Sequence, residues 1–252
     1  MATRNKLQAA FFGTRILAIT TGCLGVLWGL YVLPIYRSES GVERTANKII
    51  QGQRFGVNAL AEQWPYLEKV EYAVPCRFAA VRAAAIIRMR LLEETADAVR
   101  LAESKSDSVR RAILRALSCS PADSFLWLAL YAISNNQAES VNADKVTFLR
   151  LSYKLGPNEG WISVRRNPIT LSMYEELPAD MAQMAVDEFA RLVESGFYDE
   201  AFYILINPAW RVREVLLKKL KDVPRAHRAA LAKRLYEHGY DVEVPDIERP
   251  VR

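Results

Sequence analysis

The most apolar segment of the chain is an uninterrupted run near its amino end. Residues 16–36 read ILAITTGCLGVLWGLYVLPIY and contain no charged side chain. Twenty-one helical residues at 1.5 Å each extend about 31 Å, the thickness of the hydrocarbon core of a bilayer. Arg15 and Arg37 close the run at its two ends. The pattern predicts one transmembrane helix over residues 16–36, preceded by a short basic tail, residues 1–15.

Two other interpretations of this run are weaker. A cleavable signal peptide has a shorter apolar core and a small-x-small cleavage site, and the following residues, LPIYRSES, contain no such site. A core helix of a soluble protein is rarely apolar on every face over this length.

Three glycines in the run predict a packing face. Gly22, Gly25 and Gly29 are spaced by three and four residues, so they share one side of a helix. Small residues at this spacing let a second membrane helix approach closely. We predict a docking surface for a membrane partner here, with ordinary glycine usage as the alternative.

The remainder of the chain predicts helices and no strands. Residues 37–56 are polar and predict a stalk or a short helical connector. From residue 57 onward no run alternates apolar and polar residues at a period of two, and prolines divide the chain into short segments. Residues 57–252 therefore predict one α-helical domain, with later helices at 109–119, 121–135, 143–155, 157–165, 178–195, 198–206, 208–221 and 224–238.

Local signals set the ends of these helices. Ser120-Pro121-Ala122-Asp123 predicts a helix start with a capping serine and proline at the first helical position. Gly156-Pro157 repeats the signal with a glycine in the capping position. Gly196 and Gly239 follow helical segments and predict carboxyl-terminal caps.

Charge is concentrated at the amino end. The net charge is +5, and the tail with the apolar run contributes three basic residues and no acid, which leaves +2 for the rest. Because a nucleic-acid-binding domain carries a concentrated basic excess, we predict no nucleic-acid partner. Lysine and arginine counts on the two sides of the run are nearly equal. A short basic tail before a single span favours an amino end inside the cell and a large domain outside.

Cysteine and histidine usage predicts no metal site and no cofactor. Cys76 and Cys119 stand 43 residues apart and are able to pair if the domain lies outside the cytoplasm. Two buried free thiols are the favoured interpretation, because no spacing rule joins them. The two histidines, His227 and His238, have no recognisable ligand spacing, and the chain lacks a CxxC motif and a phosphate-binding glycine loop.

An internal period carries a family resemblance. Pro121 and Pro157 recur at 36 residues, and Trp127 and Trp161 recur at 34, a period typical of stacked helix pairs. Residues 105–165 resemble the tetratricopeptide repeat, which implies stacked helical hairpins. The second copy departs from the family pattern, and the alternative is an irregular array of helices that share common capping chemistry. The matching positions are Ala116, Pro121, Trp127 and Leu130, with Ile113 in place of the family's aromatic residue.

The layout of basic tail, single span and repeat-like helices is similar to that of single-pass inner-membrane proteins of bacteria. Some of these accompany exopolysaccharide or O-antigen biosynthesis, and others assist the protein translocon. Residues 153–169, YKLGPNEGWISVRRNPI, carry most of this resemblance. It implies a scaffold or adaptor whose partners are the lipid bilayer and other membrane or envelope proteins.

One polar and aromatic cluster is the candidate binding site of the domain. Trp161, Arg165, Arg166 and Asn167 are predicted to lie together at a loop edge. Arginine with tryptophan is able to hold a carboxylate or a sugar, and both residues are enriched in interface hot spots. The alternative places the tryptophan in the core of stacked helices.

These patterns together predict an all-α protein with one N-terminal transmembrane helix and a tetratricopeptide-like domain, acting as a scaffold rather than an enzyme. One alternative is an accessory subunit of another membrane complex, docked through its transmembrane helix. A second is an envelope glycan hydrolase that uses Glu159, although glycoside hydrolysis needs a second carboxylate that the sequence does not identify.

Overall fold

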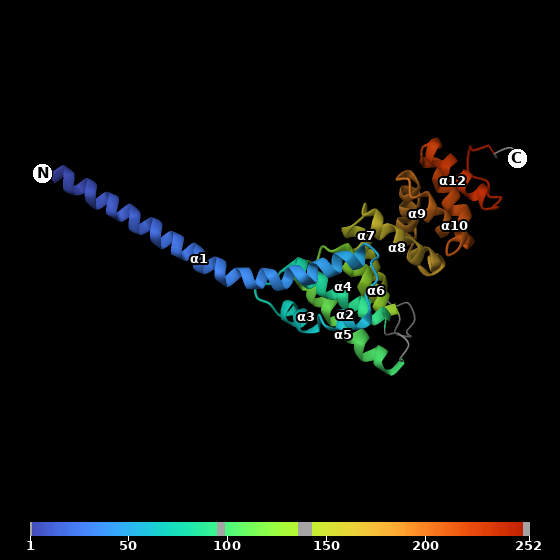
Figure 1. Cartoon of the computed structure of the whole chain (residues 1–252). Coiled ribbons are helices and arrows are strands. Elements are labelled where there is room, and N and C mark those ends of the chain that lie inside the picture. Colours follow the sequence, from blue (N-terminus) through green and yellow to red (C-terminus); the bar gives the residue numbers. More distant parts are fainter. Residues whose placement is uncertain (1, 95–98, 136–142, 249–252) are drawn as a thin grey trace. The chain divides into compact units, whose positions relative to one another are not determined.

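The computed structural model describes residues 2–94, 99–135 and 143–248, and every regular element in these ranges is a helix (Figure 1). This confirms the predicted all-α class. The chain divides into two compact units, unit 1 (Met1–Cys119) and unit 2 (Ser120–Arg252). The division falls inside the range 57–252 that we predicted as one helical domain.

Helix α1 (Ala2–Ile50) contains the apolar run and continues well beyond it. Its window Arg15–Leu33 is long and apolar enough to cross a membrane, and none of that window is buried by the rest of the chain. The helix continues through residues 37–50. For this segment the sequence predicted either a stalk or a short helical connector, and the structure shows a helix. Pro34 lies inside α1, and a proline bends a helix because it removes one intrahelical hydrogen bond. Figure 1 shows α1 changing direction between its bare part, which no other helix contacts, and its covered part, which packs against unit 1.

Unit 1 packs four further helices around the end of α1. They are α2 (Val57–Ala61), α3 (Trp64–Glu71), α4 (Phe78–Glu94) and α5 (Val99–Cys119). Helix α4 is the centre of the unit, because α1, α2, α3 and α5 all contact it. Its middle, residues 83–87, is buried on every side, as a run of apolar residues without a polar face requires. Val42 and Ala46 of α1 are buried in the same core.

A disulfide closes unit 1. Cys76, in the loop between α3 and α4, is bonded to Cys119, the last residue of α5, with Cα atoms 6.1 Å apart. The favoured expectation of two buried free thiols is therefore wrong. The sequence spacing carried no signal, because the packing of α4 against α5 is what returns the end of α5 to the start of α4.

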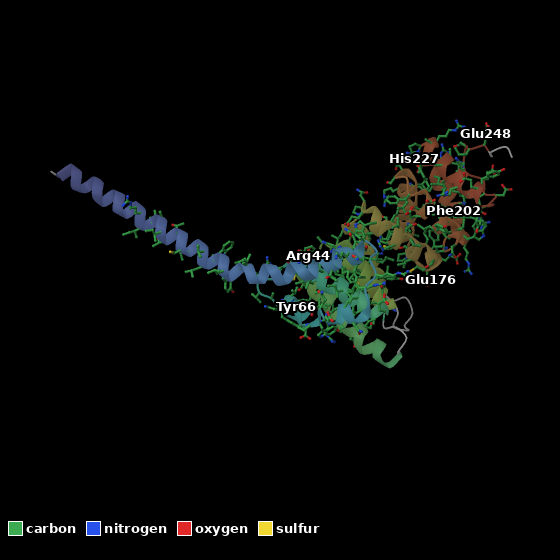
Figure 2. The ribbon with its side chains drawn as sticks, viewed as in Figure 1. Arg44, Tyr66, Glu176, Phe202, His227 and Glu248 are labelled. Atoms are coloured by element: carbon green, nitrogen blue, oxygen red, sulfur yellow. A yellow bond between two sulfur atoms is a disulfide. The ribbon has the colours of Figure 1, made fainter. Side chains whose placement is uncertain are left out.

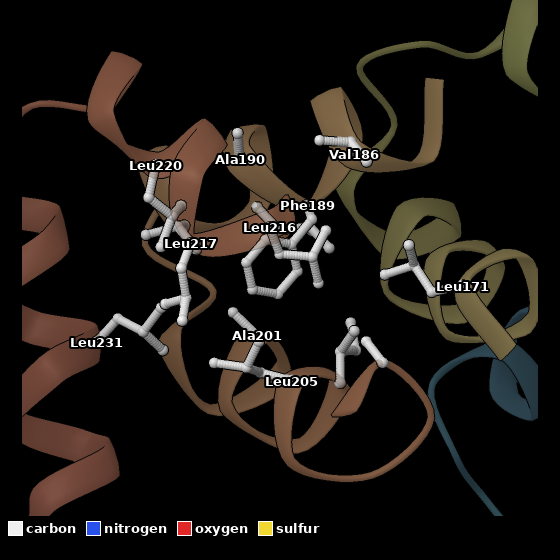
Figure 3. Packing of buried hydrophobic residues seen from close by; sticks show 14 of the residues in the cluster. Leu171, Val186, Phe189, Ala190, Ala201, Leu205, Leu216, Leu217, Leu220 and Leu231 are labelled. Atoms are coloured by element: carbon white, nitrogen blue, oxygen red, sulfur yellow. The ribbon is translucent and has the colours of Figure 1, made fainter. Parts of the chain in front are cut away.

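Unit 2 is built from consecutive helices that pack as neighbours. Helix α6 packs against α7, and α8 packs against α9. Figure 3 shows Phe189 of α9 surrounded by Leu205 and Leu216, and all three side chains are fully buried. The tetratricopeptide-like stacking of these helices remains a prediction. The elements are α6 (Ser124–Asn135), α7 (Ala143–Leu155), α8 (Gly160–Ser172), η1 (Tyr174–Glu176), α9 (Ala179–Glu194), α10 (Tyr198–Ile206), η2 (Trp210–Val212), α11 (Arg213–Lys219), η3 (Leu220–Asp222) and α12 (Arg225–Glu237).

The predicted glycine caps are confirmed. Gly196 has φ +84° and Gly239 has φ +80°, in the left-handed region that favours glycine. The amide of Phe197 donates to the carbonyl of Leu192 at 3.0 Å, which satisfies one of the last carbonyls of α9.

The two predicted proline starts are wrong by three residues. Helix α6 begins at Ser124, and Asp123 caps it by accepting a hydrogen bond from the amide of Leu126 at 3.0 Å. Helix α8 begins at Gly160. At Gly156 the chain passes so close to α6 that an added Cβ would lie 2.6 Å from the Cβ of Ser124. Both proline segments therefore form turns that precede a helix.

The disulfide predicts a specific thiol count. In the unreduced, denatured chain only Cys23 should react with a maleimide, and all three cysteines should react after reduction. The double variant Cys76→Ser/Cys119→Ser should lose about 4 kcal/mol of stability in unit 1, because the bond closes a loop of 43 residues. Chemical denaturation measures this loss, and Cys23→Ser is the control. Three reactive thiols before reduction would contradict the pairing.

Candidate functional site: a groove beside Trp64

An apolar groove of about 210 Å³ opens on unit 1 between α2, α3, α4 and α5. Trp64, at the start of α3, forms one wall and is partly exposed. Apolar side chains from the end of α4 and the middle of α5 also line the groove. The lining residues are Val57, Ala61, Trp64, Arg88, Leu91, Leu92, Ser108 and Val109.

A second, more polar cavity of about 500 Å³ shares Trp64, Arg88 and Ser108 with the groove. Arg88 separates the two, and its guanidinium makes a bidentate ion pair with Glu71. The distances are 2.5 Å from Nε to Oε1 and 2.9 Å from Nη2 to Oε2. The Arg88 guanidinium also lies 4.1 Å from the centre of the Trp64 ring. A bidentate, stacked arginine holds a fixed geometry, so the shared boundary is rigid.

Of the arginines that line the polar cavity, Arg111 is the exposed one. Arg115 donates from Nε to the carbonyl of Glu71 at 3.0 Å. Glu68 accepts from the indole nitrogen of Trp64 at 3.1 Å. Arg111 is exposed and, among the described residues, has no hydrogen bond or ion pair. The groove thus offers an apolar trough beside an available guanidinium.

Sequence reasoning missed this site. Its members are drawn from four helices spread over residues 57–115, so no local spacing joins them. One signal was present: Arg88 interrupts the apolar run of α4. A buried arginine requires a carboxylate partner nearby, and Glu71 supplies it.

The predicted cluster in unit 2 lies in a helix and not at a loop edge. Trp161, Arg165, Arg166 and Asn167 all belong to α8. Arg166 and Asn167 have no exposed surface, so they cannot contact a partner of the folded unit. The binding role predicted for these two is wrong, because they face α7 and α9 from the inward side of α8.

Arg166 instead centres a buried polar network. Its Nη2 lies 2.5 Å from Oε1 of Glu188, and its Nη1 donates to the hydroxyl of Ser152 at 2.9 Å. Nη2 also donates to the carbonyl of Gly156 at 3.0 Å, which ties down the loop before α8. The guanidinium stacks on Tyr153, 4.0 Å from the ring centre. Burial, followed by the nearby negative charge of Glu188, raises the pKa of Tyr153 well above its usual value.

Trp161 and Arg165 remain partly accessible. Arg165 donates to the carbonyl of Trp161 at 2.8 Å, and its guanidinium lies 5.7 Å from the indole ring centre. The indole packs on Phe125, with ring centroids 5.2 Å apart. The Trp161 ring is therefore used partly in packing. A partner role for these two residues stays a prediction.

The other predicted sites also remain predictions. Added Cβ atoms at Gly22, Gly25 and Gly29 would meet nothing within 4 Å, so that face of α1 is open. The carboxylate of Glu159 accepts from the hydroxyl of Ser124 at 3.2 Å and stands at the start of α8. Among the described residues, no three histidine, cysteine or acidic side chains gather as a metal site.

No protein-family model, curated protein or solved structure matches this chain. The functional interpretation therefore rests on the geometry of the molecule itself.

The buried network predicts unequal effects of neighbouring arginines. Arg166→Met should lower the free energy of unfolding of unit 2 by roughly 3–5 kcal/mol, because it leaves Glu188 buried and unpaired. Arg165→Met, one residue away, should change it by less than about 0.5 kcal/mol, since Arg165 reaches solvent. Chemical denaturation of both variants measures the difference. Equal losses would contradict the assignment.

The glycine face gives a separate prediction. If another membrane helix packs on it, Gly25→Ile should shift the chain to a smaller complex in native electrophoresis while it still sediments with membranes. Thr20→Ile places the same side chain on the opposite side of α1 and should leave the complex intact. An unchanged mobility for Gly25→Ile would remove the packing role.

Proposed function

We propose that this chain is a membrane-anchored helical adaptor that holds a protein partner beside the membrane through the groove at Trp64. The observation that carries the proposal is a preformed apolar groove on the unit that α1 itself helps to build. An anchor continuous with a binding unit keeps the bound partner near the bilayer. No catalytic constellation is needed for this role.

The chemistry of the groove defines the partner segment. Leu91, Leu92 and Val109 line the trough, so the partner must present apolar side chains. Arg111 lines the adjoining polar cavity and favours a carboxylate on the same segment. An amphipathic helix of a second protein, with one acidic residue beside its apolar stripe, fits both requirements.

The disulfide supports a location of unit 1 outside the cytoplasm. Disulfides persist in oxidising compartments and are rare in the cytosol. The bond between Cys76 and Cys119 therefore favours unit 1 outside the cytoplasm, with the basic amino end inside. This agrees with the predicted topology of a bacterial inner-membrane protein with a periplasmic domain.

Envelope polysaccharide assembly is the narrower form of the proposal, and resemblance alone carries it. The stretch 153–169 that resembles such proteins forms the end of α7 and most of α8. Several of its polar members, Arg166 and Asn167 among them, are buried. These buried members of the resembling stretch are therefore not available to a partner. The proposed adaptor role does not depend on it.

A photoreactive phenylalanine in place of Val57, in the full-length chain in its native membrane, tests the groove. We expect an adduct with one protein of defined mass. Ala61→Trp places an indole in the groove and should reduce that adduct about ten-fold, a loss of roughly 1.4 kcal/mol in binding. Ala59→Trp lies on the same short helix but outside the lining, and should leave the adduct unchanged.

A charge reversal gives the second arm of the test. Arg111→Glu should weaken the same adduct, since it opposes the carboxylate of the partner, whereas Arg110→Glu, exposed but outside both cavities, should not. An adduct indifferent to both Ala61→Trp and Arg111→Glu would refute the groove as the docking site.

A further inference from the structure

Exposed apolar side chains of unit 1 gather around the loop between α3 and α4. Val74 is 90% exposed and Tyr72 is 75% exposed, the two highest values among the large apolar side chains described beyond the span. Tyr66 and Phe78, on the flanking helices, are exposed as well. We call residues 72–78, together with Tyr66, the apolar edge. A concentration of exposed apolar side chains on one edge is typical of a surface that contacts a protein or a membrane.

The apolar edge lies beside the first covered turn of α1. Phe78 lines a cavity together with Glu43 and Ala46 of α1. The disulfide from Cys76 to Cys119 fixes the loop to the end of α5. Figure 1 shows this loop at the end of unit 1 nearest the bare part of α1, and Figure 2 shows Tyr66 on the same side.

The length of α1 sets how far this edge stands from the membrane. Val42, the first buried residue of α1 among those whose side chains the structure describes, lies nine residues beyond Leu33, the end of the apolar window. Nine residues extend about 14 Å along a helix. The bend in α1 shortens the height above the membrane further. The headgroup layer occupies about 5–7 Å on each side of the hydrocarbon core, so a loop that extends back toward the span reaches it.

We propose that the apolar edge inserts into the headgroup layer of the same bilayer that α1 crosses. The sequence of residues 72–78, YAVPCRF, contains no acid and one arginine. Tyrosine rings favour the membrane–water interface. The proposal rests on the membrane anchoring of the proposed function but not on the groove. It gives unit 1 a second lipid contact, which sets its orientation relative to the bilayer.

Lipid photo-crosslinking tests this contact. A photoreactive phenylalanine replaces Tyr72, Val74, Gln53 or Trp28, one at a time, in the full chain reconstituted into phosphatidylethanolamine and phosphatidylglycerol vesicles. Gln53 is exposed and follows the far end of α1, so it is the matched control within unit 1. Trp28 lies in the apolar window and reports the anchor itself.

We expect lipid adducts at positions 28, 72 and 74, with yields at 72 and 74 at least about five-fold above that at 53. Adducts at 28 with yields at 72 and 74 equal to that at 53 would overturn the inference and leave the anchor standing. No lipid adduct at 28 would instead refute the anchor. Protein–protein adducts at 72 and 74 in the native membrane, without lipid adducts, would assign the edge to a protein partner and also overturn it.

Discussion

The structure depends on one helix, α1, whose apolar part is exposed and whose last part is packed in the core of unit 1. Within α1, the window Arg15–Leu33 is bare on every side, while Val42 and Ala46 are packed into the core of unit 1. Because one helix contains both parts, the place of the window in a membrane limits how far unit 1 stands from it. An apolar surface of this size is stable only when something other than water covers it. A bilayer meets that requirement over the length of the window.

Each unit then uses a buried arginine–glutamate pair to join two successive α-helices. In unit 1, Arg88 of α4 pairs with Glu71 of α3, and in unit 2, Arg166 of α8 pairs with Glu188 of α9. Burying two charges has a large desolvation cost, which good geometry and extra hydrogen bonds must offset. Both pairs have such support from Ser108 or Ser152 and from a stacked aromatic ring. In unit 1 the same pair forms the boundary of the groove, so packing and binding geometry are coupled there.

The sequence predicted features that depend on local chemistry. The apolar run, the all-α class and the glycine caps at 196 and 239 follow from composition, length and backbone freedom, each readable in a short window. The proline segments before α6 and α8 were placed wrongly, because proline suits both a turn and a first helical turn. Tertiary contacts favour the turn, as the close approach of Gly156 to Ser124 illustrates. The disulfide, the burial of Arg166 and the groove beside Trp64 all require knowledge of which helices meet, and no local pattern carries it.

The central claim is that α1 is embedded in lipid and carries unit 1 with it. Alkaline carbonate extraction of membranes that contain the full-length chain, followed by ultracentrifugation, tests it directly, because this treatment releases proteins held only by surface contacts. The account predicts the chain in the membrane pellet. Recovery of the intact chain in the supernatant would contradict it.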